Sequence, residues 1–446
     1  MQATVGRAGW ATFFGRLHPS TVVALGYLSY IVLGALLLCL PLAQRGAGAG
    51  ALDNLFTATS AVTTTGLTTV SVADRYSFLG QAVILVLIQL GGVGYMTVGS
   101  FFVLSRRSEL TPARVGIGKA VFSLPASFRI DKFIRSVVRF TAVIELAGAA
   151  ALYVLFRRAG VEQPLWSAVF HSVSAFCTAG FCLYNNSFES YAADPWMNGV
   201  LAALSYLGAV GFIVCVDFAR MLRGKVEQVT LTTKIILWAT LWMTVVGTTL
   251  IFLGEPLLRG LPPEERLVAA FFQCMTAMTT VGFNTVGIGA LSKATLLVII
   301  LLMVIGSSPA GTGGGLKCTT VTAILGVMRS AARGEKEARF WGRSIPPDRV
   351  WAAVATLGFY LATLVAGTYL LELTQPSPFE ANFFEAASAL GTVGLSMGIT
   401  SGLTGLGKLV VIGLMFCGRV GPLTLGTVLF SHVPGRPKVG DGDLAV

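Results

Sequence analysis

One short pattern occurs four times along this chain. The copies follow the consensus F-x-x-x-[ST]-A-x-x-T-x-G-[LF] and read FTATSAVTTTGL from Phe56, FHSVSAFCTAGF from Phe170, FQCMTAMTTVGF from Phe272 and FEAASALGTVGL from Phe384. Their glycines are roughly evenly spaced, at Gly66, Gly180, Gly282 and Gly394. This spacing is too long for a solenoid, whose repeats run to about 50 residues. The pattern therefore predicts one small unit present four times, with the copies meeting at one place.

The composition indicates that the chain lies in a membrane. Of its 446 residues, 54% are hydrophobic and only 12% are charged, whereas a soluble domain carries about 25% charged residues. The net charge of +11 does not require a nucleic-acid partner, because membrane proteins keep excess Lys and Arg in their cytoplasmic loops. The seven cysteines are scattered and form no CxxC pair. We therefore expect small buried residues and no transition-metal site.

Apolar runs recur in the same order around each copy of the pattern. A run long enough to cross a bilayer, about 20 residues, is followed by a shorter run, the pattern and a second long run. The long runs are 20–40 and 81–104, 133–156 and 196–221, 232–253 and 294–328, and 350–373 and 406–430. The shorter runs, which predict re-entrant helices facing a watery cavity, are 52–63, 164–175, 265–278 and 379–390.

These runs predict an all-α polytopic membrane protein with eight spans. It consists of four repeats of span, re-entrant pore helix and span around a pseudo-fourfold pore. The repeats divide the chain at 1–110, 111–228, 229–345 and 346–446, and the third has an interrupted second span.

Loop charges predict the orientation of these spans. Connections between units are rich in Arg and Lys, whereas connections within a unit carry more Asp and Glu. Because positive loops stay in the cytoplasm, we expect the connections between units and both termini to be cytoplasmic. The first 20 residues lead into an apolar run with no evident cleavage site, which predicts a retained first span. The repeated pattern then opens towards the outside.

Four polar, glycine-containing segments at membrane depth suit the passage of an ion. An ion must exchange its water shell for protein oxygens, as rings of backbone carbonyls allow in potassium channels. Glycine permits the positive φ that turns carbonyls towards a shared axis. The Thr two residues earlier adds a hydroxyl and favours extended backbone. The candidate filter residues are Thr64, Thr65 and Gly66; Thr178, Ala179 and Gly180; Thr280, Val281 and Gly282; and Thr392, Val393 and Gly394.

The charges around these segments indicate a monovalent cation. No Asp or Glu lies between the Ser or Thr and the Gly of any copy, so a carboxylate ring for divalent cations is not expected. The preceding short helices point their partially negative ends at the centre, which favours cations. A single T-x-G would mean little, because small residues are common at helix contacts in membranes. Four copies in the same context favour K⁺ bound at filter carbonyls.

These residues give the chain a resemblance to the Trk/Ktr/HKT superfamily of potassium transporters, and most of all to the Ktr-type ion-conducting subunit. The resemblance extends from about 18 to 433. Members have four units of span, pore helix and span with one filter glycine each, and glycine in all four goes with potassium permeability. Trk-type subunits usually carry two further N-terminal helices, whereas this chain reaches its first span near Ser20. The resemblance implies a passive, channel-like potassium uptake protein of the bacterial cell membrane.

A glycine-rich stretch interrupts the second long run of the third unit. Gly costs about 1 kcal/mol and Pro about 3 at an interior helix position, so this stretch predicts a break. A loop outside the membrane is one interpretation, and an intramembrane loop is the other; the spacing does not match a phosphate-binding loop. The resemblance implies an intramembrane gate. The candidate gate residues are Gly306, Ser307, Ser308, Pro309, Ala310, Gly311, Thr312, Gly313, Gly314, Gly315 and the following Lys317.

Ionisable residues also occur within the apolar runs. Arg419 lies deep in the last run, and an intramembrane Arg usually faces a cavity or a partner. The resemblance implies that it projects into the pore and opposes ion passage, so Arg419 joins the candidate gate. For Glu145 and Asp217 both a structural and a functional role stay open. His171 stands alone and is a poor candidate for a metal ligand.

Partners are predicted from the resemblance. It implies a homodimer in which each protomer has its own pore, and a separate cytoplasmic ring of RCK-type regulatory subunits. The sequence contains no Rossmann unit, so we expect no cofactor in this chain and ATP or ADP on that partner. A sodium dependence stays open.

Other classes of function are less favoured. An enzyme would need a nucleophile with its base or a metal cluster, and a secondary cation symporter would show inverted repeats. Four parallel repeats with one broken helix are expected instead. A Trk-type potassium or sodium transporter subunit remains the alternative.

Overall fold

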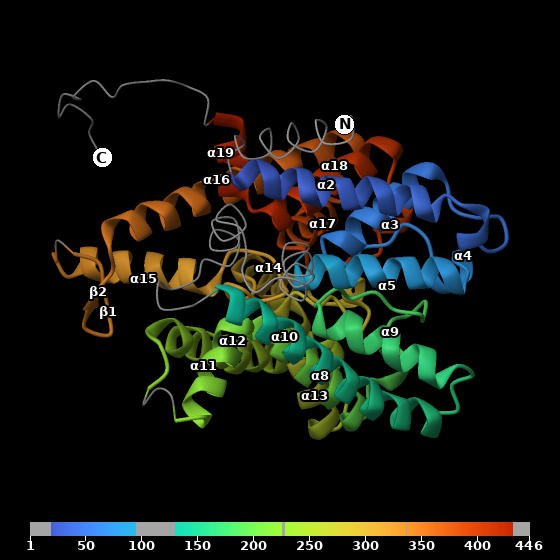
Figure 1. Cartoon of the computed structure of the whole chain (residues 1–446), viewed down its shortest axis with the longest axis horizontal. Helices are drawn as coiled ribbons and strands as arrows, with labels where there is room; N and C mark the ends of the chain where they lie inside the picture. The colour runs from blue at the N-terminus through green and yellow to red at the C-terminus, as the bar shows by residue number, and fades with distance from the viewer. Residues whose placement is uncertain (1–18, 95–129, 225–227, 336, 431–446) are drawn as a thin grey trace, which may run out of the picture.

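The computed structural model describes residues 19–94, 130–224, 228–335 and 337–430, which form a bundle of helices (Figure 1). Within these ranges the sheet content is a small hairpin of β1 (Arg339–Phe340) and β2 (Arg343–Ser344). The predicted helical class is therefore confirmed. Both termini and the basic connection in 95–129, on which the predicted orientation partly depends, lie outside the described residues.

The helices follow one another in four sets of similar order. Each set begins with a long helix: α2 (Pro19–Leu38), α8 (Ile130–Arg158), α12 (Leu231–Gly254) and α16 (Pro347–Thr374). A shorter helix comes next: α3 (Ala51–Val62), α9 (Pro164–Phe176), α13 (Pro263–Thr279) and α17 (Phe379–Gly391). Each set ends with a helix or a helix pair: α5 (Phe78–Val93), α10 (Pro195–Val210) with α11 (Phe212–Leu222), α14 (Lys293–Ile305) with α15 (Cys318–Ala332), and α18 (Gly405–Val420) with α19 (Pro422–Phe430).

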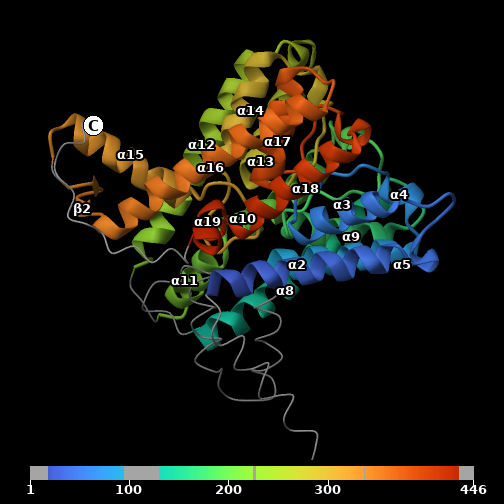
Figure 2. The same cartoon turned by 90° about the horizontal axis from the view of Figure 1, so that it is seen from above.

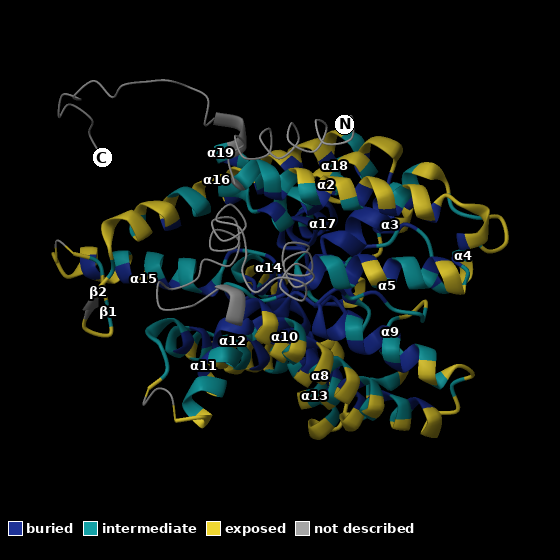
Figure 3. Cartoon of the chain, viewed as in Figure 1, coloured by how far each residue is buried: buried dark blue, intermediate teal, exposed yellow. Residues whose placement is uncertain are grey.

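The shorter helices form the centre of the molecule. Figure 3 shows α3 and α17 buried in the middle, while the outer helices expose much of their surface. The phenylalanine that opens each copy of the sequence pattern is fully buried, at Phe56, Phe170, Phe272 and Phe384. The repeated pattern therefore lies at the convergence of the four sets.

The long helices present apolar side chains outwards. Four described helices are long and apolar enough to cross a membrane, Ser20–Leu38, Phe133–Arg158, Leu231–Gly254 and Pro347–Thr374, and α10 with α11 is a fifth if the bent pair counts as one span. On three of them Leu36, Leu146 and Leu253 are more than 60% exposed. Because such surface is unfavourable in water, these helices are suited to contact with lipid.

One helix of each set, α5, α10, α14 or α18, ends at a glycine with positive φ, and in the second, third and fourth sets a further helix follows. These glycines are Gly94, Gly211, Gly306 and Gly421, with φ of 86°, 89°, 37° and 94°. Between α10 and α11 the axis turns by 91°. Glycine allows this because it has no Cβ to clash in the left-handed region. The expectation that 196–221 and 406–430 are continuous spans, with one broken helix in the chain, is therefore wrong.

Further glycines bring these last helices against the ends of the shorter ones. A methyl group added at Gly91, Gly208 or Gly418 would collide with the backbone carbonyl of Val62, Phe176 or Leu390, respectively. Small residues of this kind allow two helix backbones to approach closely. The breaks consequently lie next to the carboxyl ends of α3, α9 and α17.

One part of the chain projects from the body. In Figure 2, α15, the hairpin and the first turns of α16 form an arm that extends beyond the other helices. The backbone N–H of Arg339 donates to the Ser330 hydroxyl at 3.1 Å, which fixes the hairpin to the end of α15.

Candidate functional site

The four shorter helices end in the same way. Just beyond the last turn of each helix lies a threonine whose backbone is left-handed. The backbone N–H of the residue after this threonine donates to the carbonyl five residues before it. The φ angles are 52° at Thr64, 50° at Thr178, 59° at Thr280 and 48° at Thr392. Of the returning hydrogen bonds, that from Thr65 N to the Ser60 carbonyl is 2.8 Å long. This arrangement is a Schellman end.

Threonine is an unusual residue for this position. Glycine normally occupies it, and an L-residue costs about 1–2 kcal/mol there. Strain of this kind persists where the surroundings over-determine it, which is common at functional sites. The expectation of extended backbone at Thr64 and its three counterparts is therefore wrong, because the helix end and its packing outweigh the intrinsic preference of threonine.

The four glycines that follow form a closed ring. A methyl group on Gly66 would lie 2.5 Å from the Ala179 carbonyl oxygen. The same group on Gly180 would collide with the Val281 carbonyl, on Gly282 with the Val393 carbonyl, and on Gly394 with the Thr65 carbonyl. Each glycine thus faces the next copy of the pattern, and the fourth returns to the first. The twelve candidate filter residues are brought together at one place.

The threonine side chains on one side of this ring meet the glycine-rich stretch. The Thr178 hydroxyl lies 3.1 Å from the Thr312 hydroxyl, and the Thr280 hydroxyl accepts from Gly314 N at 3.1 Å. The Thr392 hydroxyl is buried with no hydrogen-bond partner among the described residues. The segment from Gly306 to Gly315 is therefore seated directly against the ring.

The seated segment is also bonded to the break between α10 and α11. The Ser308 hydroxyl donates to the Ala209 carbonyl at 2.7 Å and to that of Val210. Thr312 N donates to the Gly208 carbonyl at 3.1 Å. A loop that joins two helices outside the bundle would not make these contacts, so the segment lies inside the helix bundle.

Two cationic side chains approach the same place. Arg419 donates to the Thr64 hydroxyl at 3.0 Å, to the Thr312 carbonyl and to the Gly91 carbonyl. Lys317 donates to the Gly313 carbonyl at 2.7 Å. Within the described residues, no ion pair with a carboxylate involves either side chain. The positive charges are held by neutral oxygens beside the ring.

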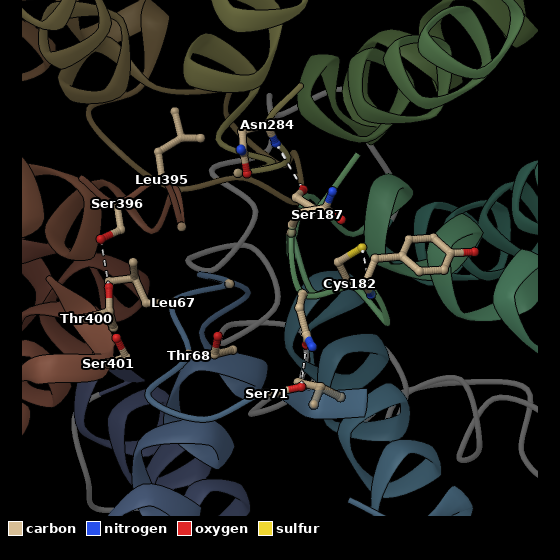
Figure 4. Close-up of a pocket in the computed structure, with 18 of the residues that line it drawn as sticks. Leu67, Thr68, Ser71, Cys182, Ser187, Asn284, Leu395, Ser396, Thr400 and Ser401 are labelled. Atoms are coloured by element: carbon tan, nitrogen blue, oxygen red, sulfur yellow. Dashed lines mark hydrogen bonds between the residues drawn. The ribbon is translucent and has the colours of Figure 1, made fainter. Parts of the chain in front are cut away.

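A cavity of about 410 Å³ opens on the other side of the ring. It is lined by the four glycines and by the residues that follow them, and Figure 4 shows these side chains around an open centre. The Asn284 amide there donates to the Glu189 carboxylate at 2.8 Å. Ser71 and Asn185 also line it, and hydrogen bonds from Asn185 and Ser71 lower the pKa of the nearby Asp74. Ionised carboxylates at such a mouth attract cations.

The sequence analysis missed a set of polar anchors at the second position of the pattern. These residues are Thr57, His171, Gln273 and Glu385. Glu385 is fully buried and accepts hydrogen bonds from the hydroxyls of Ser396, at 2.8 Å, and Thr400. It therefore ties α17 to the segment that follows Gly394. The recurrence of a polar residue at a position between buried neighbours was the available signal.

His171 and Gln273 also join their helices to the segments that follow, through an imidazole and an amide in place of a carboxylate. His171 Nε2 accepts from Leu183 N at 3.1 Å while Nδ1 lies 2.7 Å from the Ser167 carbonyl. The Gln273 amide lies 3.2 Å from the Thr285 hydroxyl. His171 is thus a structural hydrogen-bonding residue, and the described residues contain no group of His, Cys, Asp and Glu suited to a metal ion.

Glu145 and Asp217, the two acids noted within the apolar runs, accept hydrogen bonds from neighbouring helices and loops. Glu145 accepts from the Gln89 amide of the first set at 3.1 Å. Asp217 accepts from Thr230 N at 3.0 Å and from the Thr233 hydroxyl at 2.7 Å, so it fixes the start of α12.

Comparison with known proteins defines the class to which this arrangement belongs. Residues 18–435 match the family described as TrkH, cation transport protein. Because the match extends over nearly the whole chain, the chain belongs to this family of cation transport proteins and is not an enzyme.

Individual relatives are potassium uptake proteins. The chain is 35% identical over 414 residues to Ktr system potassium uptake protein B of Bacillus subtilis, covering 92% of each chain. It is 35% identical over 420 residues to potassium/sodium uptake protein NtpJ of Enterococcus hirae, again covering 92% of each. The potassium transporter TrkH from Vibrio parahaemolyticus has the same fold, with a TM-score of 0.74 at 21% identity over 92% of this chain and 84% of that one. The resemblance to the Trk and Ktr proteins is therefore confirmed.

Proposed function

We propose that this chain is the ion-conducting subunit of a potassium uptake system and that it works as a passive, channel-like pore. The observation that carries the proposal is the ring in which each of Gly66, Gly180, Gly282 and Gly394 faces a carbonyl of the next copy. Carbonyl oxygens around one axis can replace the water shell of a monovalent cation. Relatives named as potassium uptake proteins support K⁺ as the ion.

In this proposal the four sets of helices are four repeats of span, pore helix and span. The long first helices cross the membrane, the shorter helices re-enter it, and the broken last helices complete eight spans with both termini cytoplasmic. The carboxyl ends of α3, α9, α13 and α17 then direct their partially negative carbonyls at the ion. Single glycines per copy leave fewer well-formed sites than a TVGYG filter, so looser selectivity follows.

The glycine-rich segment acts as the gate. With Thr312, Gly313 and Gly314 seated against the threonines, and with Arg419 and Lys317 adding two positive charges, a cation leaving the ring meets a steric and an electrostatic barrier. In this proposal the seated segment closes the pathway. Lack of side-chain bulk lets the segment take a second path of similar energy, which a partner can favour by binding that state.

The partner in this proposal is a cytoplasmic ring of RCK-type regulatory subunits that binds ATP or ADP on a separate chain. Relatives named as components of a Ktr system support a multi-component assembly. The arm of α15 and the β1–β2 hairpin connects the gate to the cytoplasmic side, so it is a suitable place for the partner to act. We also propose a homodimer with one pore per protomer.

A second ion and a second mechanism are less favoured. The name of the Enterococcus hirae relative includes sodium, so transport of Na⁺ or activation by Na⁺ is the main variant of the proposal. A coupled symporter would be expected to bind substrate at the midplane between inverted repeats, which the parallel order of the four patterns does not favour.

The test is rubidium uptake by the full chain reconstituted in vesicles, with and without competing sodium. A passive pore moves Rb⁺ down its concentration gradient. Net uptake of Rb⁺ stops when the membrane potential balances that gradient. Uptake against the combined gradient, driven by a sodium or proton gradient, would instead support a symporter. Absence of Rb⁺ uptake under every gradient, both by wild type and by a folded variant that lacks residues 309–314 of the seated segment, would contradict the proposed function.

A further inference from the structure

An apolar groove lies outside the ion pathway, between α12, α15 and the β1–β2 hairpin. Its volume is about 430 Å³, within the range of about 300–1,000 Å³ that is typical of sites for small organic ligands. Its walls include Trp238 and Trp242 of α12, Leu325 of α15 and Trp341 of the hairpin. One wall of the groove is α12, which is long and apolar enough to span a membrane.

The tryptophans of this groove form an exposed cluster. The rings of Trp238 and Trp242 stack with centroids 6.4 Å apart, and Trp341 packs edge-on against Trp238 at 6.3 Å. The three residues are 49%, 57% and 50% exposed. Tryptophan is enriched where acyl chains meet lipid headgroups. The cluster therefore indicates that the groove opens at that boundary of the bilayer.

Basic residues adjoin the groove residues along the chain, although none is among the residues that line the groove. Lys234 precedes the groove on α12, Arg329 lies one turn beyond Leu325 on α15, and Arg339 is next to the groove residue Phe340 in the hairpin. Arg329 and Arg339 are exposed, and Arg339 forms an ion pair with Glu337 at 3.5 Å. This rim complements a negatively charged headgroup.

The inner end of the groove reaches both ends of the glycine-rich segment. Ile305, the last residue of α14, and Cys318, the first residue of α15, both line it. A smaller cavity that also contains Cys318 continues to Ser307 and Ser308. An occupant of the groove would therefore contact the two points from which the segment starts and ends.

We propose that this groove binds one acyl chain of an anionic phospholipid, with the headgroup at Lys234, Arg329 and Arg339. The bound chain holds α15 against α12 and thereby stabilises the seated segment; this last step rests on the proposed gate. A second copy of the protein is a poorer occupant. A stable interface needs about 800 Å² from each partner, whereas the groove is narrow and its basic rim would repel the same rim of a symmetric copy.

The test is native mass spectrometry of the full chain, titrated with phosphatidylglycerol or with zwitterionic phosphatidylcholine. Ala239 lies in the groove wall, and the variant Ala239→Phe is designed to fill the groove. The matched control is Ala352→Phe, at an exposed position of α16. We expect wild type and Ala352→Phe to retain one phosphatidylglycerol that Ala239→Phe loses. Arg339→Gln should bind it about fivefold more weakly, because one basic residue near an anionic lipid contributes about 1 kcal/mol.

Two results would overturn the lipid site. Equal retention of phosphatidylglycerol by wild type and Ala239→Phe, or equal retention of both lipids by wild type, would show unspecific surrounding lipid. Conversion of a dimer to a monomer by Ala239→Phe, measured by the same method, would assign the groove to a second copy.

The effect on the gate is tested separately by Rb⁺ uptake in vesicles with and without phosphatidylglycerol. We expect the lipid to reduce uptake by wild type and to leave Ala239→Phe unaffected. If Ala239→Phe loses the lipid but its uptake still falls with phosphatidylglycerol, the coupling to the segment is wrong although the site stands. If neither wild type nor a folded variant that lacks residues 309–314 moves Rb⁺ in any lipid, the proposed function fails, and lipid binding is still decided by the mass spectra.

Discussion

Arg419 donates a 3.0 Å hydrogen bond to the hydroxyl of Thr64, although the two residues are 355 positions apart in the chain. The same guanidinium donates to the carbonyls of Thr312 and Gly91. One side chain of α18 thus joins the left-handed end of α3, the glycine-rich segment and the end of α5. Its charge is held by neutral oxygens at the place where a cation would leave the glycine ring.

This contact predicts that Arg419→Gln increases ion flux. Removing the charge lowers the barrier to a passing cation, and relief of about 1 kcal/mol already gives about a fivefold increase. Glutamine retains an amide donor for the Thr64 hydroxyl. The measurement is initial Rb⁺ uptake in vesicles at equal protein content, with Arg259→Gln, in the η3 turn (Leu257–Gly260), as the control. An aggregated Arg419→Gln with a normal control would assign Arg419 a purely structural role.

Removing the Ser308 hydroxyl is predicted to weaken the closed state of the gate. Its hydroxyl donates to the carbonyls of Ala209 and Val210, and a hydrogen bond of this kind contributes about 1 kcal/mol. Ser308→Ala should therefore favour the open path and raise Rb⁺ uptake by about fivefold or more. Ser190→Ala, on the η2 turn (Glu189–Tyr191), removes an exposed hydroxyl and serves as the control. Unchanged uptake by a folded Ser308→Ala would contradict a gating role for the segment.

The anchor Glu385 is predicted to maintain ion selectivity. Glutamine has one acceptor oxygen in place of two, so Glu385→Gln leaves the hydroxyl of Ser396 or Thr400 without its acceptor. The segment after Gly394 then loosens, and the ratio of Rb⁺ to Na⁺ uptake should fall about fivefold for a loss of about 1 kcal/mol. The control is Glu380→Gln, which lies on the same helix as Glu385 and loses an exposed ion pair with Lys293 of α14. A lower melting temperature with an unchanged ratio would show that Glu385 supports the fold alone.

The ion pair between Asp53 and Lys408 predicts a pH-dependent stability. It joins α3 to α18 at 2.6 Å and closes the circle from the last set of helices to the first. Burial raises the pKa of Asp53, but hydrogen bonds from Lys408 and Thr69 outweigh it, so the pKa lies below its usual value of 3.8. The stabilisation is present above pH 3.8 and is lost as the pH falls through the lower folded-state pKa.

Asp53→Asn should consequently lower the melting temperature at pH 7 and pH 5 by the same amount, and by less at pH 3. Thermal unfolding of the detergent-solubilised protein measures this difference. The control is Asp348→Asn, which replaces an exposed aspartate in the first turn of α16. A melting-temperature difference between wild type and Asp53→Asn that does not shrink at pH 3 would rule out a contribution from the ion pair.

The sequence predicted a helical protein of the Trk and Ktr family because the pattern and its surroundings recur four times. Phe56, Gly66 and their counterparts recur at equal offsets, and the apolar runs around them repeat as well. A pattern that recurs in this way can be recognised in the sequence without any knowledge of tertiary contacts. The closeness of the four glycines in the structure follows from the same repetition.

Local propensity failed where tertiary contacts decide the backbone. Thr64 adopts φ of 52° although threonine favours strands, because the end of α3 and the seated segment hold it. The breaks at Gly211 and Gly421 were missed since an isolated glycine is tolerated inside a membrane helix. At Gly211 the turn of 91° depends on close packing against Ser308 and Gly311 of the third set. The partners of Arg419 were equally unpredictable, because Gly91 and Thr312 come near it only in the folded chain.

The glycine ring is the central claim, and Gly66→Ser tests it most directly. Gly66 has φ of 94°, and a side chain there would press on the Ala179 carbonyl of the next copy. Gly413→Ser on α18, where an added Cβ meets nothing within 4 Å, is the matched control. The measurement is the ratio of Rb⁺ to Na⁺ uptake in vesicles at equal protein yield. We predict a fall of roughly tenfold for Gly66→Ser, equivalent to 1.4 kcal/mol, and no change for Gly413→Ser; an unchanged ratio in a folded Gly66→Ser would contradict the account.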